Sequence, residues 1–129
     1  MATLAFTRGS IVSGSDVPQQ NFEKSFTCTG SSWTKVSEVM TAGTNTALIV
    51  AVDVSAVKFF RIHSTGAATI KTNDSGSPDN TIPLVANKPY DYEPTDYSPF
   101  LLTVDVADIY VTNAAEITLT IEVLQDATP

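Results

Sequence analysis

The chain has 129 residues, of which 43% are hydrophobic and only 16% are charged, a composition typical of one folded domain rather than a disordered segment. The net charge of −7 argues against sequence-independent binding to DNA or RNA, which depends on Lys and Arg neutralising phosphates. The longest apolar run, ALIVAV at 47–52, is far shorter than the roughly 20 residues of a membrane-spanning helix, so no membrane contact is expected.

The N-terminal segment is predicted to be one short strand followed by a flexible arm or loop. MATLAFTRGS lacks a basic region followed by a long apolar core, so no secretory signal is expected. Residues 3–8 are a weak strand candidate, whereas small and polar residues and a proline interrupt the pattern at 9–21, GSIVSGSDVPQQN. Residues 1–21 are therefore assigned to the strand and arm, and 22–129 to a β-sandwich domain. The arm is either an ordinary loop or a segment that reaches a neighbouring subunit.

From residue 22 onward the dominant hydrophobic period is two, which is typical of β-strands. It is plainest in EITLTIEVL at 116–124, where apolar residues alternate with Thr and Glu. TALIVAVDV at 46–54 is interpreted as a strand covered on both sides for part of its length. Further strands are predicted at 22–28, 33–39, 57–64, 67–72, 81–86, 100–104 and 108–112. Short strands separated by Gly, Pro, Asn, Asp and Ser clusters predict an all-β sandwich or small barrel, with the strand order left open.

The charges are distributed unevenly along the chain. All seven basic residues lie within 1–88, together with six acidic ones, whereas 89–129 contain eight acidic residues and no basic one. One interpretation is a solvated acidic surface that aids solubility. The other is a polarised domain with a near-neutral face for docking and an acidic face that points outward.

No motif in the sequence indicates a catalytic or metal-binding site. Cys28 is the only cysteine, so no internal disulfide can form, which fits a reducing cytosol. His63 is the only histidine, and the H-x-x-x-H, C-x-x-C and G-x-S-x-G motifs are missing. NDSGSPDN at 73–80 lacks the spacing of an EF-hand and is interpreted as a turn. The protein is therefore expected not to be an enzyme and to bind no cofactor or metal.

The segment NKPYDYEPTDYSPF at 87–100 combines three tyrosines with three prolines. The prolines stiffen the backbone and keep it out of a central strand, while Tyr90, Tyr92 and Tyr97 offer large amphipathic faces. Three interpretations stay open: local packing at the open end of the sandwich, contact with another protein, and stacking on sugars with Trp33 as a fourth aromatic residue.

Several phrases in the second half of the chain carry a family resemblance. They are VDVSAVKFFRIHS at 52–64, TIPLVANKPYDY at 81–92 and SPFLLTVDVADIYVTN at 98–113, followed by a last strand near the C-terminus. In their order and style these phrases resemble the small β-sandwich proteins of tailed-phage virions. The resemblance implies a jelly-roll-like antiparallel sandwich without catalysis, made in the cytoplasm of an infected bacterium and located on the capsid surface of the virion.

The role implied by the resemblance is that of a capsid decoration, or cement, protein. Such a protein binds the major capsid protein and stabilises the head, often as a homotrimer. A tail, neck or head-fibre component and a carbohydrate-binding module are the alternatives. Residues expected at protein contacts are Phe6, Ile11 and Val12 between subunits, and Trp33, Tyr90, Tyr92 and Tyr97 against the capsid.

Overall fold

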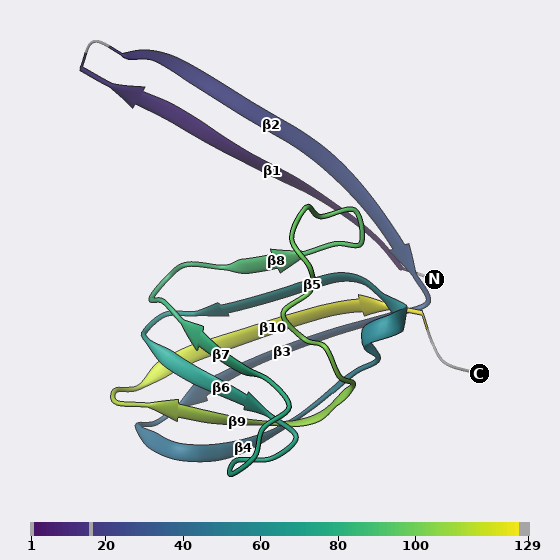
Figure 1. Cartoon of the computed structure of the whole chain (residues 1–129), viewed down its shortest axis with the longest axis vertical. Coiled ribbons are helices and arrows are strands. Elements are labelled where there is room, and N and C mark those ends of the chain that lie inside the picture. Colours follow the sequence, from purple (N-terminus) through teal and green to yellow (C-terminus); the bar gives the residue numbers. More distant parts are fainter. Residues whose placement is uncertain (1, 16, 127–129) are drawn as a thin grey trace.

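The protein is a two-sheet β-sandwich from which a long β-hairpin projects (Figure 1). The computed structural model describes the backbone of residues 2–15 and 17–126, and the side chains of these residues except 7–14 and 17–23. The strands are β1 Ala2–Gly14, β2 Val17–Gly30, β3 Ser32–Met40, β4 Gly43–Val52, β5 Val57–Ser64, β6 Ala68–Thr72, β7 Thr81–Leu84, β8 Tyr90–Tyr92, β9 Val106–Asn113 and β10 Ile117–Gln125, with one turn of 3-10 helix, η1 Val54–Ala56.

Eight of the described strands form two four-stranded sheets in the order of a jelly roll. One sheet has the order β3-β10-β5-β8 and the other β4-β9-β6-β7. The pairing is nested, because β3 pairs with β10, β4 with β9, β5 with β8 and β6 with β7, all antiparallel. This pattern arises when a long two-stranded ribbon coils, so that successive strand pairs along the ribbon belong alternately to one sheet and to the other. The predicted jelly-roll-like sandwich is confirmed.

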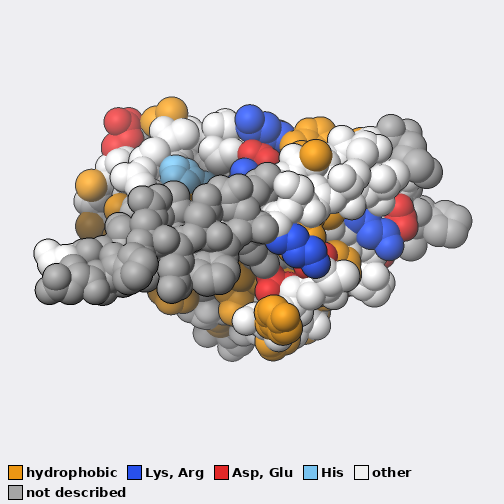
Figure 2. Space-filling model, turned by 90° about the horizontal axis from the view of Figure 1, so that it is seen from above, with side chains coloured by type: hydrophobic (Ala, Val, Ile, Leu, Met, Phe, Trp, Pro, Cys, Tyr) orange, Lys and Arg blue, Asp and Glu red, His pale blue; other side chains and the backbone are white. Residues whose placement is uncertain are grey.

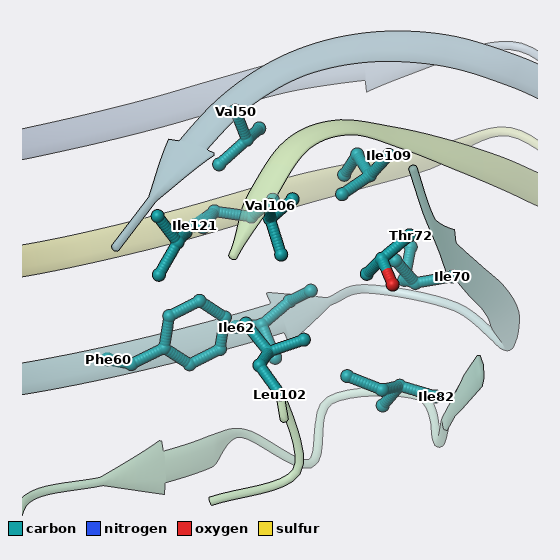
Figure 3. A pocket seen from close by; sticks show the side chains of 11 residues that line it. Val50, Phe60, Ile62, Ile70, Thr72, Ile82, Leu102, Val106, Ile109 and Ile121 are labelled. Atoms are coloured by element: carbon teal, nitrogen blue, oxygen red, sulfur yellow. The ribbon is translucent and has the colours of Figure 1, made fainter. Parts of the chain in front are cut away.

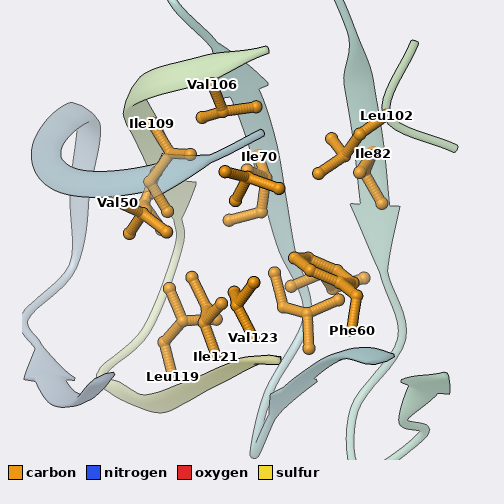
Figure 4. Packing of buried hydrophobic residues seen from close by; sticks show 14 of the residues in the cluster. Val50, Phe60, Ile70, Ile82, Leu102, Val106, Ile109, Leu119, Ile121 and Val123 are labelled. Carbon is orange, nitrogen blue, oxygen red and sulfur yellow. The ribbon is translucent and has the colours of Figure 1, made fainter. Parts of the chain in front are cut away.

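The core lies between the two sheets and accounts for the period-two pattern. In β10 four alternate apolar residues face the main core, each no more than 2% exposed: Ile117, Leu119, Ile121 and Val123. Figure 4 shows side chains from β4, β6, β7 and β9 meeting those of β5 and β10. The sandwich therefore has its own hydrophobic core. Burying each of these apolar side chains contributes about 1.5–3 kcal/mol to folding.

Residues 100–104 were predicted to form a strand, and this prediction is wrong. The segment alternates between buried and exposed residues, but side chains rather than a neighbouring strand accept its backbone N–H groups. The N–H of Leu101 donates to Oη of Tyr90 at 3.2 Å, and the N–H of Thr103 donates to Oδ1 of Asn80 at 3.0 Å. A strand-like hydrophobic pattern therefore arises here without a hydrogen-bonded ladder.

Two edge strands also differ from the sequence-based prediction. The strand β4 was expected to be covered on both sides for part of its length, but one of its faces is exposed at Ala47, Ile49 and Ala51, with Ile49 80% exposed. The three-residue strand β8 was not predicted, because it lies in the proline-rich segment 87–100. Its place at a sheet edge agrees with the rule that proline-flanked segments stay out of sheet centres.

The N-terminal segment departs furthest from expectation. The strands β1 and β2 pair from Ala2 opposite Gly30 to Val12 opposite Gln20, and after an irregularity Gly14 pairs with Val17. The predicted loop over 9–21 is therefore wrong for its described residues, because backbone pairing across the hairpin overrides the weak strand propensity of the segment. β2 passes without a break through residue 21, where the sequence suggested the domain boundary. Figure 1 shows the hairpin running away from the sandwich.

Candidate interaction surfaces

A small second core holds the root of the hairpin on the outer face of the β3-β10-β5-β8 sheet. Phe59 and Leu124, both 0% exposed, cluster with Cys28 of β2, apart from the main core. The Phe6 ring lies 4.7 Å from the Phe59 ring and stacks on Phe26 at 5.1 Å. Ala2 and Leu4 complete the cluster. Phe6, expected at a subunit contact, is thus half-buried within its own chain.

The other two residues expected at a subunit contact, Ile11 and Val12, lie on β1 farther along the hairpin. Ile11 pairs with Asn21 and Val12 with Gln20 through the backbone. Their side chains lie outside the described residues.

We call the second core around Phe59, Leu124 and Cys28 the root cluster. Its environment is expected to make the stability of the protein depend on pH through Cys28. Burial raises the pKa of the Cys28 thiol, and the nearby carboxylate of Glu93 raises this pKa further. Because the pKa is higher in the folded state, stability is fully present below the ordinary thiol pKa and falls as pH rises through it. We expect the free energy of unfolding to decrease above about pH 8.5 in wild type. In the Cys28→Ala variant, the part of this decrease that comes from the thiol should be absent.

Urea unfolding of both proteins at a series of alkaline pH values measures this difference. The slope of stability against pH should be steeper for wild type than for Cys28→Ala. Equal slopes would show that the thiol does not ionise more easily on unfolding.

Two of the three tyrosines in the proline-rich segment pack within the chain. The Tyr92 ring stacks on Phe100 with centroids 4.2 Å apart, and the Tyr90 ring lies 6.2 Å from Phe60. Tyr97, by contrast, is fully exposed. Local packing is therefore what the structure shows for Tyr90 and Tyr92, and Tyr97 is left available for contact with a partner.

Tyr97 lies beside the hairpin in a groove between β2 and the loop after β8. The groove is lined by Lys24, Phe26, Glu93, Thr95, Asp96 and Tyr97. Nζ of Lys24 lies 5.0 Å from the centroid of the Phe26 ring. Glu93, only 4% exposed, accepts hydrogen bonds from the backbone N–H and the hydroxyl of Thr95, which hold the loop in shape. The groove combines the aromatic rings of Phe26 and Tyr97 with charged side chains of both signs.

The rest of the outer face of the β3-β10-β5-β8 sheet carries alternating charges. Strand register places Lys35, Glu122, Arg61 and Asp91 in one row across the four strands. Nε of Arg61 donates to the carboxylate of Asp91. The charges in the row balance, and Figure 2 shows basic and acidic side chains close together on the face in view, with hydrophobic ones in small groups.

Trp33 and His63 also lie on this sheet. Trp33 pairs with Leu124 at the end of the sheet that carries the hairpin root, and it is 40% exposed. His63 lines a shallow groove together with Arg61, Pro89, Thr120 and Glu122. Cys28 lies in the root cluster instead, so His63 and the Cys28 thiol are not part of one site.

The interior of the sandwich contains a small space between the two sheets. Figure 3 shows this space, which is lined by apolar residues and Thr72. Its volume is about 10 Å³, close to the minimum for one water molecule and far below the several hundred Å³ of a ligand pocket.

The described residues contain no cluster of three or more His, Cys, Asp or Glu side chains suited to a metal ion. In the 73–80 loop, the carboxylate of Asp74 accepts backbone hydrogen bonds from Ser77 at 3.0 Å and Gly76 at 2.7 Å, which lower the pKa of Asp74. These bonds are those of a tight turn. Within the described part of the chain, no helix has the length and apolarity to cross a membrane.

The comparisons with known proteins add little to this picture. No protein-family model and no curated protein matches the sequence. Among solved structures, the chain is similar to a de novo designed double-stranded β-helix determined by solution NMR, with 18% identity and a TM-score of 0.39. The match covers 72% of this chain and 99% of the designed one. The jelly-roll assignment rests on the strand order described above.

Proposed function

We propose that the protein is a non-enzymatic structural protein of a phage virion. Its role is that of a capsid decoration protein, which binds the major capsid protein as a homotrimer and stabilises the head. The observation that carries the proposal is the hairpin β1–β2, which is anchored to the sandwich through its root cluster and extends away from it (Figure 1). A two-stranded hairpin is marginally stable by itself in water, so an extended one is expected to contact a partner.

Two exposed aromatic side chains flank the root of this hairpin. Trp33 lies next to the root cluster on β3, and Tyr97 lines the groove beside β2. Large aromatic side chains dominate the energy of protein interfaces, and these two could anchor the sandwich on a capsid while the hairpin extends. Decoration then acts by mass action, because a protein that binds only the assembled shell stabilises it relative to free subunits.

The alternative of a carbohydrate-binding module has less support. Sugar stacking needs exposed rings held side by side, but Tyr90 packs against Phe60 and Tyr92 against Phe100 within the chain. A tail, neck or head-fibre protein would use the same hairpin, and only the partner would differ.

Co-sedimentation with empty heads of the phage that encodes the protein tests the proposal. Light scattering of the protein alone gives its oligomeric state. We expect Trp33→Ala and Tyr97→Ala each to weaken binding to heads by about 2 kcal/mol, because each removes an aromatic anchor.

Val85→Ala is the matched control for these two variants. Val85 is 60% exposed and lies outside both the root cluster and the groove beside β2, so its truncation should leave binding to heads unchanged. A protein that ignores heads and tails but binds a member of a glycan panel would overturn the proposal in favour of the carbohydrate-binding module.

A further inference from the structure

Among the four edge strands of the sandwich, β4 combines length with the absence of charge, and it pairs regularly with β9 from Thr46 to Ile49, with irregularities on either side. Its ten residues, GTNTALIVAV, contain no charged residue and no proline, and Ile49 is 80% exposed. The other three edges are protected: β3 carries Lys35 and Glu38, β7 has four residues including a proline, and β8 has only three residues. A long uncharged edge pairs readily with another strand.

The hairpin offers two strands that are each long enough to pair along the whole of β4. β1 and β2 have 13 and 14 residues and form a two-stranded sheet of their own. Each therefore has one side that the described sheets leave without a neighbouring strand. A third strand would satisfy the backbone groups along that side and stabilise the hairpin.

The charges favour the hairpin over a second sandwich as the occupant of β4. Residues 1–30 contain two basic and two acidic residues, so the hairpin segment is neutral, whereas 31–129 contain five basic and twelve acidic ones. Two sandwiches that met edge to edge would bring together two bodies of net charge −7. A neutral hairpin laid along an uncharged strand avoids this repulsion.

We propose that the hairpin of one copy pairs along β4 of a second copy, so that the β4-β9-β6-β7 sheet continues into the hairpin of its neighbour. This contact deepens the proposed function and rests on the oligomer included in it. Each copy has one hairpin to donate and one β4 edge to accept. The contact is therefore heterologous, and the proposed homotrimer corresponds to three such contacts closed into a ring.

Two variants block the two halves of the contact separately. Ile49→Lys places a charge on the β4 edge at a position exposed enough to tolerate it. Ile11→Pro interrupts β1 away from the root cluster, because proline lacks the N–H group. Val39→Lys, 65% exposed on the already charged edge strand β3, is the matched control. Circular dichroism and thermal unfolding establish that each variant retains the sandwich.

Light scattering should show an oligomer for wild type and Val39→Lys, and a monomer for Ile49→Lys and Ile11→Pro. An equimolar mixture of the two blocked variants should form a one-to-one dimer, because the intact hairpin of the first pairs with the intact β4 of the second. Ile11→Pro that dimerises alone would overturn the proposal in favour of β4 pairing with itself. A monomeric wild type, or an Ile49→Lys variant with the wild-type mass, would also overturn it.

Binding to heads is scored separately in the same proteins. A wild-type monomer that co-sediments with heads would contradict the hairpin exchange but keep the decoration function. If the protein is an oligomer that responds to both variants as expected but does not bind heads, the hairpin exchange would be supported and the decoration function contradicted.

Discussion

Replacing Phe60 by alanine is expected to destabilise the protein by about 3–5 kcal/mol. Phe60 is 3% exposed on the inner face of β5, where its ring lies 5.3 Å from Phe100 and 6.2 Å from Tyr90. Truncation opens a cavity between the sheets and removes the support on which the segment 87–100 rests. Since natural domains are stable by about 5–15 kcal/mol, such a loss brings the protein close to unfolding.

Urea unfolding of the Phe60→Ala variant measures this loss directly. Tyr97→Ala serves as the control, because the Tyr97 side chain is fully exposed and its removal should change stability by less than about 0.5 kcal/mol. A loss below about 1 kcal/mol for Phe60→Ala would mean that the two sheets close over the missing ring without a cavity.

Replacing the neighbouring Phe59 by alanine is expected to lower the free energy of unfolding by about 3 kcal/mol. It should also loosen the anchorage of the hairpin on the sandwich. Phe59 is 0% exposed and points to the opposite face of β5, into the root cluster with Phe6, Cys28 and Leu124. Without this ring the hairpin loses the centre of its anchorage. Amide hydrogen exchange should therefore accelerate more in β1 and β2 than in β9 or β10.

The two adjacent phenylalanines form a matched pair for this experiment. Phe60→Ala should raise exchange throughout the sandwich, and Phe59→Ala should raise it chiefly in the hairpin, because local opening needs only the contacts of one region to break. If Phe59→Ala raised exchange equally in β2 and β9, the hairpin and sandwich would open as one unit.

Much of the sandwich was predictable because period-two alternation is a local property. EITLTIEVL at 116–124 predicts a half-buried strand by itself, and β10 follows it closely. The nested strand order was not predictable in the same way, because β3 and β10 pair across most of the chain. The distinction between a jelly roll and an immunoglobulin-like sandwich depends on such long-range pairs.

The hairpin and the root cluster illustrate two different limits of sequence reasoning. Gly9 and Ser10 have weak strand propensity, and only their pairing with β2 makes them part of a strand. The root cluster had a signal: VKFFRIHS at 57–64 is apolar on both faces, which indicates a strand covered from both sides. What covers its outer face was not readable, because Cys28 and Phe6 reach it from a distant segment.

The exposed aromatic residues show why the interface assignments were mixed. Tyr90, Tyr92 and Tyr97 are chemically alike and close in sequence, yet only Tyr97 points into solvent. The difference depends on Phe100 and Phe60, which tertiary structure brings beneath the first two rings. The composition of the segment 87–100 therefore indicated a possible contact surface, but it did not show which of the three tyrosines is exposed.

The central position of β10 has a consequence for synthesis on the ribosome. β10 lies between β3 and β5, yet it is the last described strand to be translated. Until it emerges, β3 and β5 have no neighbour to join them, and the β3-β10-β5-β8 sheet cannot assemble. The nascent sandwich therefore stays incompletely folded until β10 has left the ribosome, and that step joins both halves of the sheet at once.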